Sequence, residues 1–148
     1  MAKSDMTEAQ LVTVAPMFLV ADIQRSVRYY RDVLGFAVER IWGDPPSFAM
    51  PIRDGLTVML LEVADKSRIR PNGTDGESWD AHFWVRDADQ LFRELAARNV
   101  TIAYAPLDRD YYGNREFAIY DPDRYLIAFG HDIEAKRQRE ATRMKSSA

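Results

Sequence analysis

The sequence predicts an α+β fold of two βαβββ modules, whose curled mixed β-sheets surround a cleft and carry the helices on the outside. The first observation is a strand–helix pattern at residues 18–35, in which Asp22 is suited to cap a helix and Gly35 to end it. The second is the return of this pattern 65 residues later, at residues 83–99. The third is that short runs of strand-forming residues follow each copy. A repeat of this length is too short to be a domain, so it indicates two copies of one supersecondary unit.

The helical part of each copy has one apolar face. Ile23, Val27, Tyr30 and Leu34 follow one another at gaps of four, three and four residues, which places them on one side of a helix. In the second copy the apolar face consists of Leu91, Phe92 and Leu95. The positions that match at the common offset are Phe18 with Phe83, Val20 with Val85, Asp22 with Asp87, and Arg28 with Arg93.

The remaining elements follow in the same order in both modules. In the first module we expect strands at residues 12–20, 36–42, 47–52 and 56–63, with a hairpin turn at 53–55. Residues 64–78 are polar and form a linker. In the second module we expect a strand at 79–86, a helix at 88–98, a strand at 100–105, a long loop at 106–114, strands at 115–120 and 125–130, and a turn at 121–124 between them.

Length and composition fit one soluble domain at residues 1–132, with modules at about 12–63 and 79–131, followed by a charged tail at 133–148. Apolar residues make up 47% of the chain and charged residues 29%, with no apolar run long enough for a membrane helix. The first ten residues lack the apolar stretch of a signal peptide, and the chain contains no cysteine. We therefore expect a cytoplasmic protein without disulfides or thiolate chemistry.

Charge is distributed unevenly. Residues 133–148 contain five basic and two acidic side chains, a net charge of +3, so the rest of the chain carries −6 of the total of −3. An acidic body argues against nucleic acid as the main partner. The basic tail is interpreted as a solvated helix or a frayed end, with an interaction arm as the alternative.

Several motifs resemble the vicinal oxygen chelate superfamily, which contains glyoxalase I, extradiol dioxygenases, fosfomycin-resistance enzymes and bleomycin-resistance proteins. The resemblance covers about residues 12–132, and Arg124 departs from it because the family usually has glycine at that turn. The motifs are Val20-Ala21-Asp22, Ser26-Val27-Arg28-Tyr29-Tyr30, Leu34-Gly35-Phe36, Gly113-Asn114-Arg115-Glu116-Phe117 and Asp121-Pro122-Asp123.

The resemblance also implies where catalytic relatives would hold a divalent metal ion. Three of these four positions have no donor atom here, and a lone carboxylate cannot hold an ion that needs about three protein ligands. The four positions are Ala15, Leu60, Asp80 and Ala128. We therefore expect no metal cofactor and no catalytic residues.

A shifted metal site is the alternative. Moving two residues along each strand keeps the same face and reaches Met17, Glu62, His82 and Gly130. Glu62 and His82 are then the only donors, so a metal-dependent lyase or dioxygenase would need a non-standard ligand set. The simpler interpretation of His82 is a histidine hydrogen-bonded within the cleft.

Alternation along the strands predicts the side chains that line the cleft. Asp80, His82 and Trp84 share one face of their strand, so they should lie together. Small or apolar residues at the vacant ligand positions leave room for a guest molecule, and aromatic residues nearby can wall it. The predicted ligand-binding residues are Met17, Trp42, Phe48, Leu60, Glu62, Asp80, His82, Trp84, Tyr111 and Tyr112.

Within the superfamily the chain is most similar to the bleomycin-resistance branch, especially at residues 113–122. The resemblance implies a metal-free homodimer that sequesters a planar cationic drug in acidic, aromatic-lined grooves between subunits. We expect a small-molecule binder of an aromatic or cationic compound, such as a glycopeptide antibiotic, with no nucleic-acid or membrane partner. The alternatives are the metal-dependent lyase or dioxygenase, and an interaction or regulatory domain without a small ligand.

Overall fold

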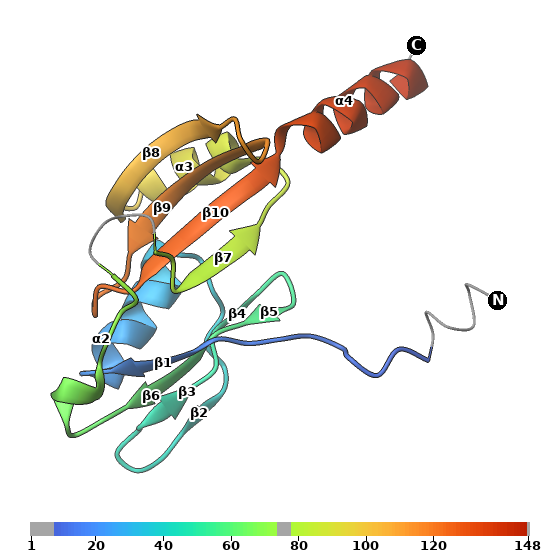
Figure 1. The fold of residues 1–148 in the computed structure, drawn as a ribbon. Helices are drawn as coiled ribbons and strands as arrows, with labels where there is room; N and C mark the ends of the chain where they lie inside the picture. Colours follow the sequence, from blue (N-terminus) through green and yellow to red (C-terminus); the bar gives the residue numbers. More distant parts are fainter. Residues whose placement is uncertain (1–7, 74–77, 148) are drawn as a thin grey trace.

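A computed structural model describes residues 8–73 and 78–147 (Figure 1). The first module contains β1 (Met17–Val20), α2 (Ile23–Arg28), η1 (Tyr29–Val33), β2 (Ile41–Trp42), β3 (Phe48–Ala49), β4 (Ile52–Arg53), β5 (Leu56–Thr57) and β6 (Met59–Glu62). After the short η2 (Lys66–Arg68), the second module contains β7 (Ala81–Trp84), α3 (Ala88–Ala96), β8 (Thr101–Arg109), β9 (Asn114–Tyr120) and β10 (Leu126–Asp132). The chain ends in α4 (Ile133–Ser147).

The two modules form two four-stranded mixed sheets of the same design. The strand orders are β1-β6-β3-β2 and β7-β10-β9-β8, and β4 with β5 forms a separate hairpin. In each sheet the first strand of the module pairs in parallel with its last strand, β1 with β6 and β7 with β10, while the other pairs are antiparallel. The predicted α+β class of two mixed-sheet modules is confirmed.

The repeated helix cap is also seen in three dimensions. The Asp22 side chain accepts a hydrogen bond from the backbone N–H of Arg25, and Asp87 does the same for Gln90, both at 3.1 Å. The two caps have φ and ψ of −148° and 105° and of −150° and 102°. Aspartate at this position satisfies one of the free N–H groups of a first turn. The predicted helix starts are therefore correct in both modules.

Several predicted strand boundaries are wrong. The strand expected at residues 12–20 begins only at Met17, and the one expected at 36–42 is reduced to Ile41–Trp42 plus one bridge between Ala37 and Ile52. The loop expected at 106–114 is mostly strand, because β8 continues to Arg109 and pairs with β9 through two register shifts. Pairing with a long neighbour overrides the weak local pattern there. Residues 74–77 of the predicted linker lie outside the described residues.

The core lies between the helices and one face of each sheet. Phe18 and Val20 of β1 are buried against Ile23, Val27 and Tyr30 of the first helical segment. In the second module three aromatic rings stack in a row, with ring centroids 5.4 Å apart for Phe83–Phe129 and 5.2 Å apart for Phe117–Phe129. Since these residues alternate with others along their strands, the opposite face of each sheet lies outside this core.

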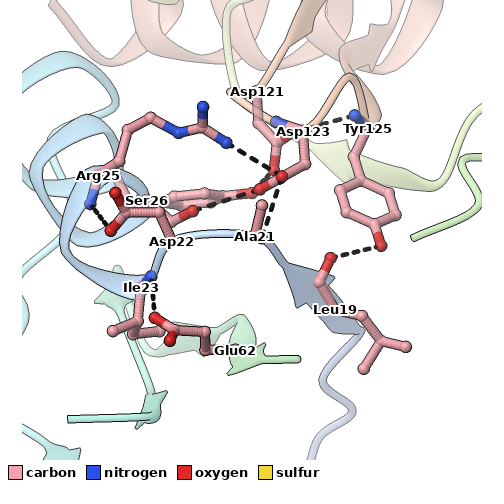
Figure 2. Close-up of polar contacts among 11 residues, drawn as sticks. Leu19, Ala21, Asp22, Ile23, Arg25, Ser26, Glu62, Asp121, Asp123 and Tyr125 are labelled. Atoms are coloured by element: carbon pink, nitrogen blue, oxygen red, sulfur yellow. Dashed lines mark hydrogen bonds and ion pairs between the residues drawn. The ribbon is translucent and has the colours of Figure 1, made fainter. Parts of the chain in front are cut away.

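The turn at residues 121–124 clasps the first module (Figure 2). Asp123 accepts hydrogen bonds from Ala21 N at 3.2 Å, Arg25 Nη2 at 3.1 Å and Ser26 Oγ at 3.4 Å. Asp121 is buried and accepts a hydrogen bond from the Tyr30 hydroxyl at 2.9 Å. Burial raises the pKa of Asp121 to about 7. This turn therefore fixes the second sheet against the start of α2.

Arg124 takes the conformation that the turn requires although it is not glycine. Its φ is +71°, in the left-handed region that glycine adopts most easily. Its guanidinium lies 3.9 Å from the centre of the Tyr120 ring. The departure from the family pattern thus leaves the turn in the geometry that glycine would give.

The first module clasps the second in return. Arg53, at the β4–β5 hairpin, donates to both carboxylate oxygens of Glu94 on α3, at 2.8 and 2.9 Å, and to the carbonyl of Leu34 at 2.8 Å. The side chains of Arg53 and Glu94 are 27% and 35% exposed. Each module therefore holds the other's helix through a hairpin turn.

Helix α4 begins directly after β10 and extends away from both sheets (Figure 1). None of its described side chains is buried. Ion pairs between neighbouring turns, such as Arg137 Nη1 to Glu134 at 3.2 Å, lie along it. No helix within residues 8–73 and 78–147 is long and apolar enough to cross a membrane.

Candidate functional site

The open face of the second sheet combines aromatic rings with buried polar groups. Strand pairing places Ala128 beside His82 and Gly130 beside Trp84, and on its other side pairs Ala128 with Ala118 and Gly130 with Glu116. Paired residues share a face. The floor of this face is therefore made of small residues, and larger side chains stand on both sides of it.

Three rings line one edge of this face. The His82 ring lies between Trp79 and Trp84, with both centroid distances at 4.7 Å. The Trp79 indole N–H donates to the Tyr104 hydroxyl at 3.0 Å. Trp84 is 65% exposed, which is unusual for a residue of its size. An exposed indole beside other rings offers a flat surface for stacking.

A buried carboxylate stands at the other edge. Glu116 is fully buried and accepts hydrogen bonds from the hydroxyls of Tyr104 and Tyr112. Arg109 Nε lies 3.6 Å from its carboxylate, so the charge of Glu116 is balanced. Burial, and then the hydrogen bond to Glu116, raise the pKa of Tyr104 to about 12. The same two causes, burial first, raise the pKa of Tyr112, so both tyrosines are neutral donors at neutral pH.

Two further polar side chains meet above Gly130. A carbon attached to its Cα in the side-chain direction would lie 3.2 Å from Asn114 Nδ2 and 3.2 Å from His82 Nε2. Within residues 8–73 and 78–147, neither nitrogen of the His82 ring nor either polar atom of the Asn114 amide has a hydrogen-bond partner, and all four atoms are buried. Burial lowers the pKa of His82, with the charge of Glu116 opposing it, so the ring is neutral at neutral pH.

The open face of the first sheet contains a run of apolar side chains. Met17 pairs with Met59 and Leu19 with Leu61, while Phe48 pairs with Leu61 on one side and Trp42 on the other. Met17 is 51% exposed and Trp42 45%. The apolar face, as we call it, consists of Met17, Leu19, Trp42, Phe48, Met59 and Leu61.

The predicted cleft residues separate into four groups. Met17, Trp42 and Phe48 lie on the apolar face, and His82 and Trp84 lie on the open face of the second sheet. Tyr112 is bonded to Glu116, whereas Tyr111 is 89% exposed and its ring meets that of Tyr112. The structure does not bring Leu60, Glu62 and Asp80 to either open face.

Leu60 and Glu62 point the opposite way from the prediction. Leu60 is fully buried in the core beside Phe18, and Glu62 Oε2 accepts from the backbone N–H of Ile23, at the start of α2, at 2.8 Å. The sequence of β6 is apolar at three successive positions, so alternation did not identify its face. In Figure 2, Glu62 points at the helix start.

Asp80 has a structural role that excludes it as a free ligand. Its two carboxylate oxygens accept from the backbone N–H groups of Asn72 and Leu126, both at 2.8 Å. With Leu60 in the core and Ala128 without a donor, the four family positions do not fit a metal ion. No three His, Asp or Glu side chains within the described ranges, 8–73 and 78–147, lie close enough to hold one.

Sequence reasoning missed Trp79, Asn114 and Glu116 as site residues. Asn114 and Glu116 alternate with Arg115 and Phe117 in β9, so two polar residues on one face of a central strand were a usable signal. Glu116 was recognised only as part of a family motif. Its role depends on Tyr104 and Tyr112, whose approach depends on the length of β8, which the sequence did not predict.

A separate groove of about 760 Å³ lies between the β4–β5 hairpin and α3. Leu34, Phe36, Phe83 and Phe129 contribute to its apolar lining, and the Arg53–Glu94 pair crosses its charged rim. It meets the open face of the second sheet only at Trp84. The unpaired polar atoms of His82 and Asn114 are not part of it.

Taken together, the fold and the site define a paired βαβββ protein with an aromatic face left open. Residues 11–129 match the family model of the Glyoxalase/Bleomycin resistance protein/Dioxygenase superfamily, and the chain belongs to this superfamily. It is 27% identical over 130 residues to the "Bleomycin resistance protein" of Geobacillus stearothermophilus and to that of Staphylococcus aureus. Each comparison covers 81% of this chain and 96% of the relative.

Solved structures show the same fold. TioX from Micromonospora sp. ML1 superposes with a TM-score of 0.65 at 19% identity, covering 82% of this chain and 99% of the other. A glyoxalase/bleomycin resistance protein/dioxygenase from Nocardioides superposes with a TM-score of 0.62 at 17% identity, covering 90% and 91%. These likenesses confirm the predicted fold family.

Proposed function

We propose that this chain is a metal-independent binding protein that sequesters a small aromatic molecule on the open face of the second sheet. The observation that carries the proposal is the exposed Trp84 indole, which contacts the His82 ring beside a floor of small residues, with Trp79 on the other side of that ring. Such a surface stacks a flat ring, and the acidic body favours a ligand with positive charge. The relatives named for bleomycin resistance support an antibiotic as the ligand class.

The family ligand positions support binding without chemistry. Asp80 is occupied by two backbone donors, and the other positions offer no donor atom. Among the described residues, the carboxylate on this face is that of Glu116. Its charge is balanced by Arg109, so it is not free to bind a metal ion or act as a base. We therefore propose no cofactor and no catalytic residue for this face, and a cytoplasmic protein that acts by stoichiometric capture.

We also propose a homodimer in which the apolar face of one copy lies opposite the open face of the second sheet of the other. That open face carries the rings of Trp79, His82 and Trp84. Contiguous exposed apolar surface is a mark of interaction sites, and Met17 and Trp42 on the apolar face are 51% and 45% exposed. The segment before β1 is also apolar and exposed, since Leu11, Val12 and Val14 are 93%, 90% and 82% exposed. The cleft would then be walled by Met17, Trp42 and Phe48 of one copy and by His82 and Trp84 of the other.

Calorimetric titration with metal-free bleomycin, with the protein dialysed against a chelator, tests the proposal. We expect saturable binding with one ligand per chain. In Trp84→Ala we expect the affinity for this ligand to fall by at least about tenfold. Met144→Ala is the matched control and should bind as the parent does, because Met144 is 73% exposed on α4, which extends away from both sheets (Figure 1). A panel of flat aromatic antibiotics extends the test if bleomycin itself is not the ligand.

Metal analysis of the purified protein tests the competing class. Stoichiometric nickel, zinc, iron or manganese that survives dialysis and disappears in His82→Ala would overturn metal-independent binding. The absence of binding by every flat aromatic compound of the panel would overturn the binder itself.

A further inference from the structure

Among the described residues, four buried polar atoms on the open face of the second sheet have no hydrogen-bond partner. They are the two ring nitrogens of His82 and the amide oxygen and nitrogen of Asn114, which lacks any partner in the described residues although the side chain is only 1% exposed. Folded proteins pair nearly all buried polar groups, and those that remain unpaired need an explanation. The surrounding donors are already engaged, because the hydroxyls of Tyr104 and Tyr112 are bonded to Glu116.

The two side chains converge on one place. Asn114 is on β9 and His82 on β7, and Gly130 on β10 lies between them. The point where a side-chain carbon of residue 130 would sit is 3.2 Å from Asn114 Nδ2, 3.2 Å from His82 Nε2 and 3.0 Å from Glu116 Cβ. Glycine at this position is what allows the imidazole and the amide to approach each other over the sheet.

Access to this place depends on Trp84. The indole contacts the His82 ring at a centroid distance of 4.7 Å and is itself 65% exposed. A side chain that is mostly in solvent has room to change rotamer on a fast timescale. Rotation of Trp84 would uncover the imidazole, whereas Trp79 on the other side is held by its hydrogen bond to Tyr104.

We propose that His82 and Asn114 form a recognition subsite for a neutral carboxamide group attached to an aromatic ring; this rests on the proposed function. Asparagine and neutral imidazole each offer one acceptor and at least one donor. A carboxamide offers the same pair in reverse and pairs with both. A carboxylate would have no cation to meet, since Arg109 faces Glu116, and a fixed cation would meet no free carboxylate.

The charged groups nearest the subsite support a neutral ligand group. Glu116 and Arg109 balance each other at 3.6 Å, and Tyr104 and Tyr112 are neutral. Ionised ligand groups lose hydration on entering such a place without gaining a partner of opposite charge. Any positive charge of the ligand would therefore remain in solvent, while its amide is buried.

Three probes of the same shape test this assignment, namely benzamide, benzoate and benzamidinium. They are titrated into the ¹⁵N-labelled full chain, and the signals of the Trp84 indole, the Asn114 side-chain amide and the His82 ring are followed. We expect all three signals to shift with benzamide, and the dissociation constants of benzoate and benzamidinium to be at least about tenfold larger.

Two variants separate recognition from folding. In Asn114→Ala we expect benzamide affinity to fall about tenfold, with the midpoint of thermal unfolding unchanged or raised because no protein hydrogen bond is lost. In Gly130→Ala the added carbon occupies the meeting point, and benzamide should no longer shift the His82 signals. Met144→Ala, on α4, is the control that should retain the parent affinities.

The outcomes are distinguishable. Equal binding of the three probes at Trp84, or unchanged benzamide affinity in Asn114→Ala, would overturn the carboxamide subsite and leave the aromatic binding face standing. If none of the probes shifts the Trp84 indole and no flat aromatic antibiotic binds, the proposed function fails as well.

Discussion

The two modules repeat the same fold, but their open faces differ in chemical character. In both modules the first strand pairs in parallel with the last strand. The helix that follows the first strand is capped by an aspartate, Asp22 or Asp87, in almost identical geometry. The open face of the first sheet is the apolar face, with Met17 and Trp42 half-exposed. The open face of the second carries the rings around His82, a buried carboxylate and unpaired polar atoms. The two modules therefore share one framework, while their open faces differ in chemistry.

The two open faces fit partners of different chemistry. An apolar surface in water is covered by another apolar surface, whereas unpaired polar atoms need hydrogen-bonding groups. The first face therefore fits the role of a wall, and the second the role of a recognition surface. The two sets of contacts that hold the modules together differ in burial. Asp121 and Asp123 are buried, whereas Arg53 and Glu94 are partly exposed.

The largest expected effect concerns the pH dependence of the buried clasp. The pKa of Asp121 is raised to about 7 by burial, so in the folded chain its proton is held up to that pH, whereas the unfolded chain loses it near pH 4. Its contribution to stability is thus complete below about pH 4 and is lost as the pH rises through about 7. We expect the free energy of unfolding of the parent, relative to Asp121→Asn, to fall by on the order of 3 kcal/mol over this window.

Urea unfolding of both proteins at pH values from 4 to 8 measures this difference. The parent and the Asp121→Asn variant share all other titrating groups. The effects of those groups therefore cancel in the difference between the two free energies of unfolding. A difference that stays constant, or grows as the pH rises, would show that Asp121 is ionised in the fold and stabilised by its donors.

The two clasps should differ when each loses its carboxylate. Asp123→Ala removes the acceptor for Ala21, Arg25 and Ser26 and should lower the free energy of unfolding by about 2 kcal/mol. The matched Glu94→Ala breaks the partly exposed ion pair with Arg53 and should cost less, about 1 kcal/mol. Equal losses in chemical denaturation would contradict the distinction between a buried and an exposed clasp.

A smaller effect is expected for Trp84, because a 65% exposed side chain contributes little to the core. Trp84→Ala should lower the free energy of unfolding by less than about 1 kcal/mol, compared with about 3–5 kcal/mol for a buried tryptophan. Its fluorescence, isolated by subtracting Trp84→Phe, should be red-shifted and accessible to quencher. Trp79→Phe supplies the comparison, since Trp79 is partly buried and bonded to Tyr104, and its emission should be bluer.

The sequence predicted the repeated framework because that framework depends on local chemistry. Asp22 and Asp87 cap helices whatever surrounds them, and Phe83 and Val85 alternate with His82 and Trp84 along one strand. The positions of some side chains were predicted wrongly, and these are residues whose surroundings come from distant segments. Asp80 is bonded to Asn72 and Leu126, and Leu60 could face either way in an apolar strand.

The polar part of the site was harder to predict for the same reason. Glu116 is surrounded by Tyr104 and Tyr112 only because β8 extends along β9 to Arg109, in a segment whose local pattern resembles a loop. The meeting of Asn114 and His82 requires the register of three strands together with glycine at residue 130. Sheet register between distant strands is set by packing, which a single sequence does not reveal.

Paramagnetic labelling tests whether the apolar face of one copy lies opposite the open face of the second sheet of another. Because the chain has no cysteine, Met17→Cys accepts a single nitroxide label on the apolar face. This unenriched, labelled protein is mixed with ¹⁵N-enriched protein that carries no label, so any broadening arises between chains. We predict selective broadening of the Trp84 and Trp79 indole signals, reversed when the nitroxide is reduced. Indole signals that remain sharp in the mixture, while the nitroxide is still oxidised, would contradict the paired arrangement.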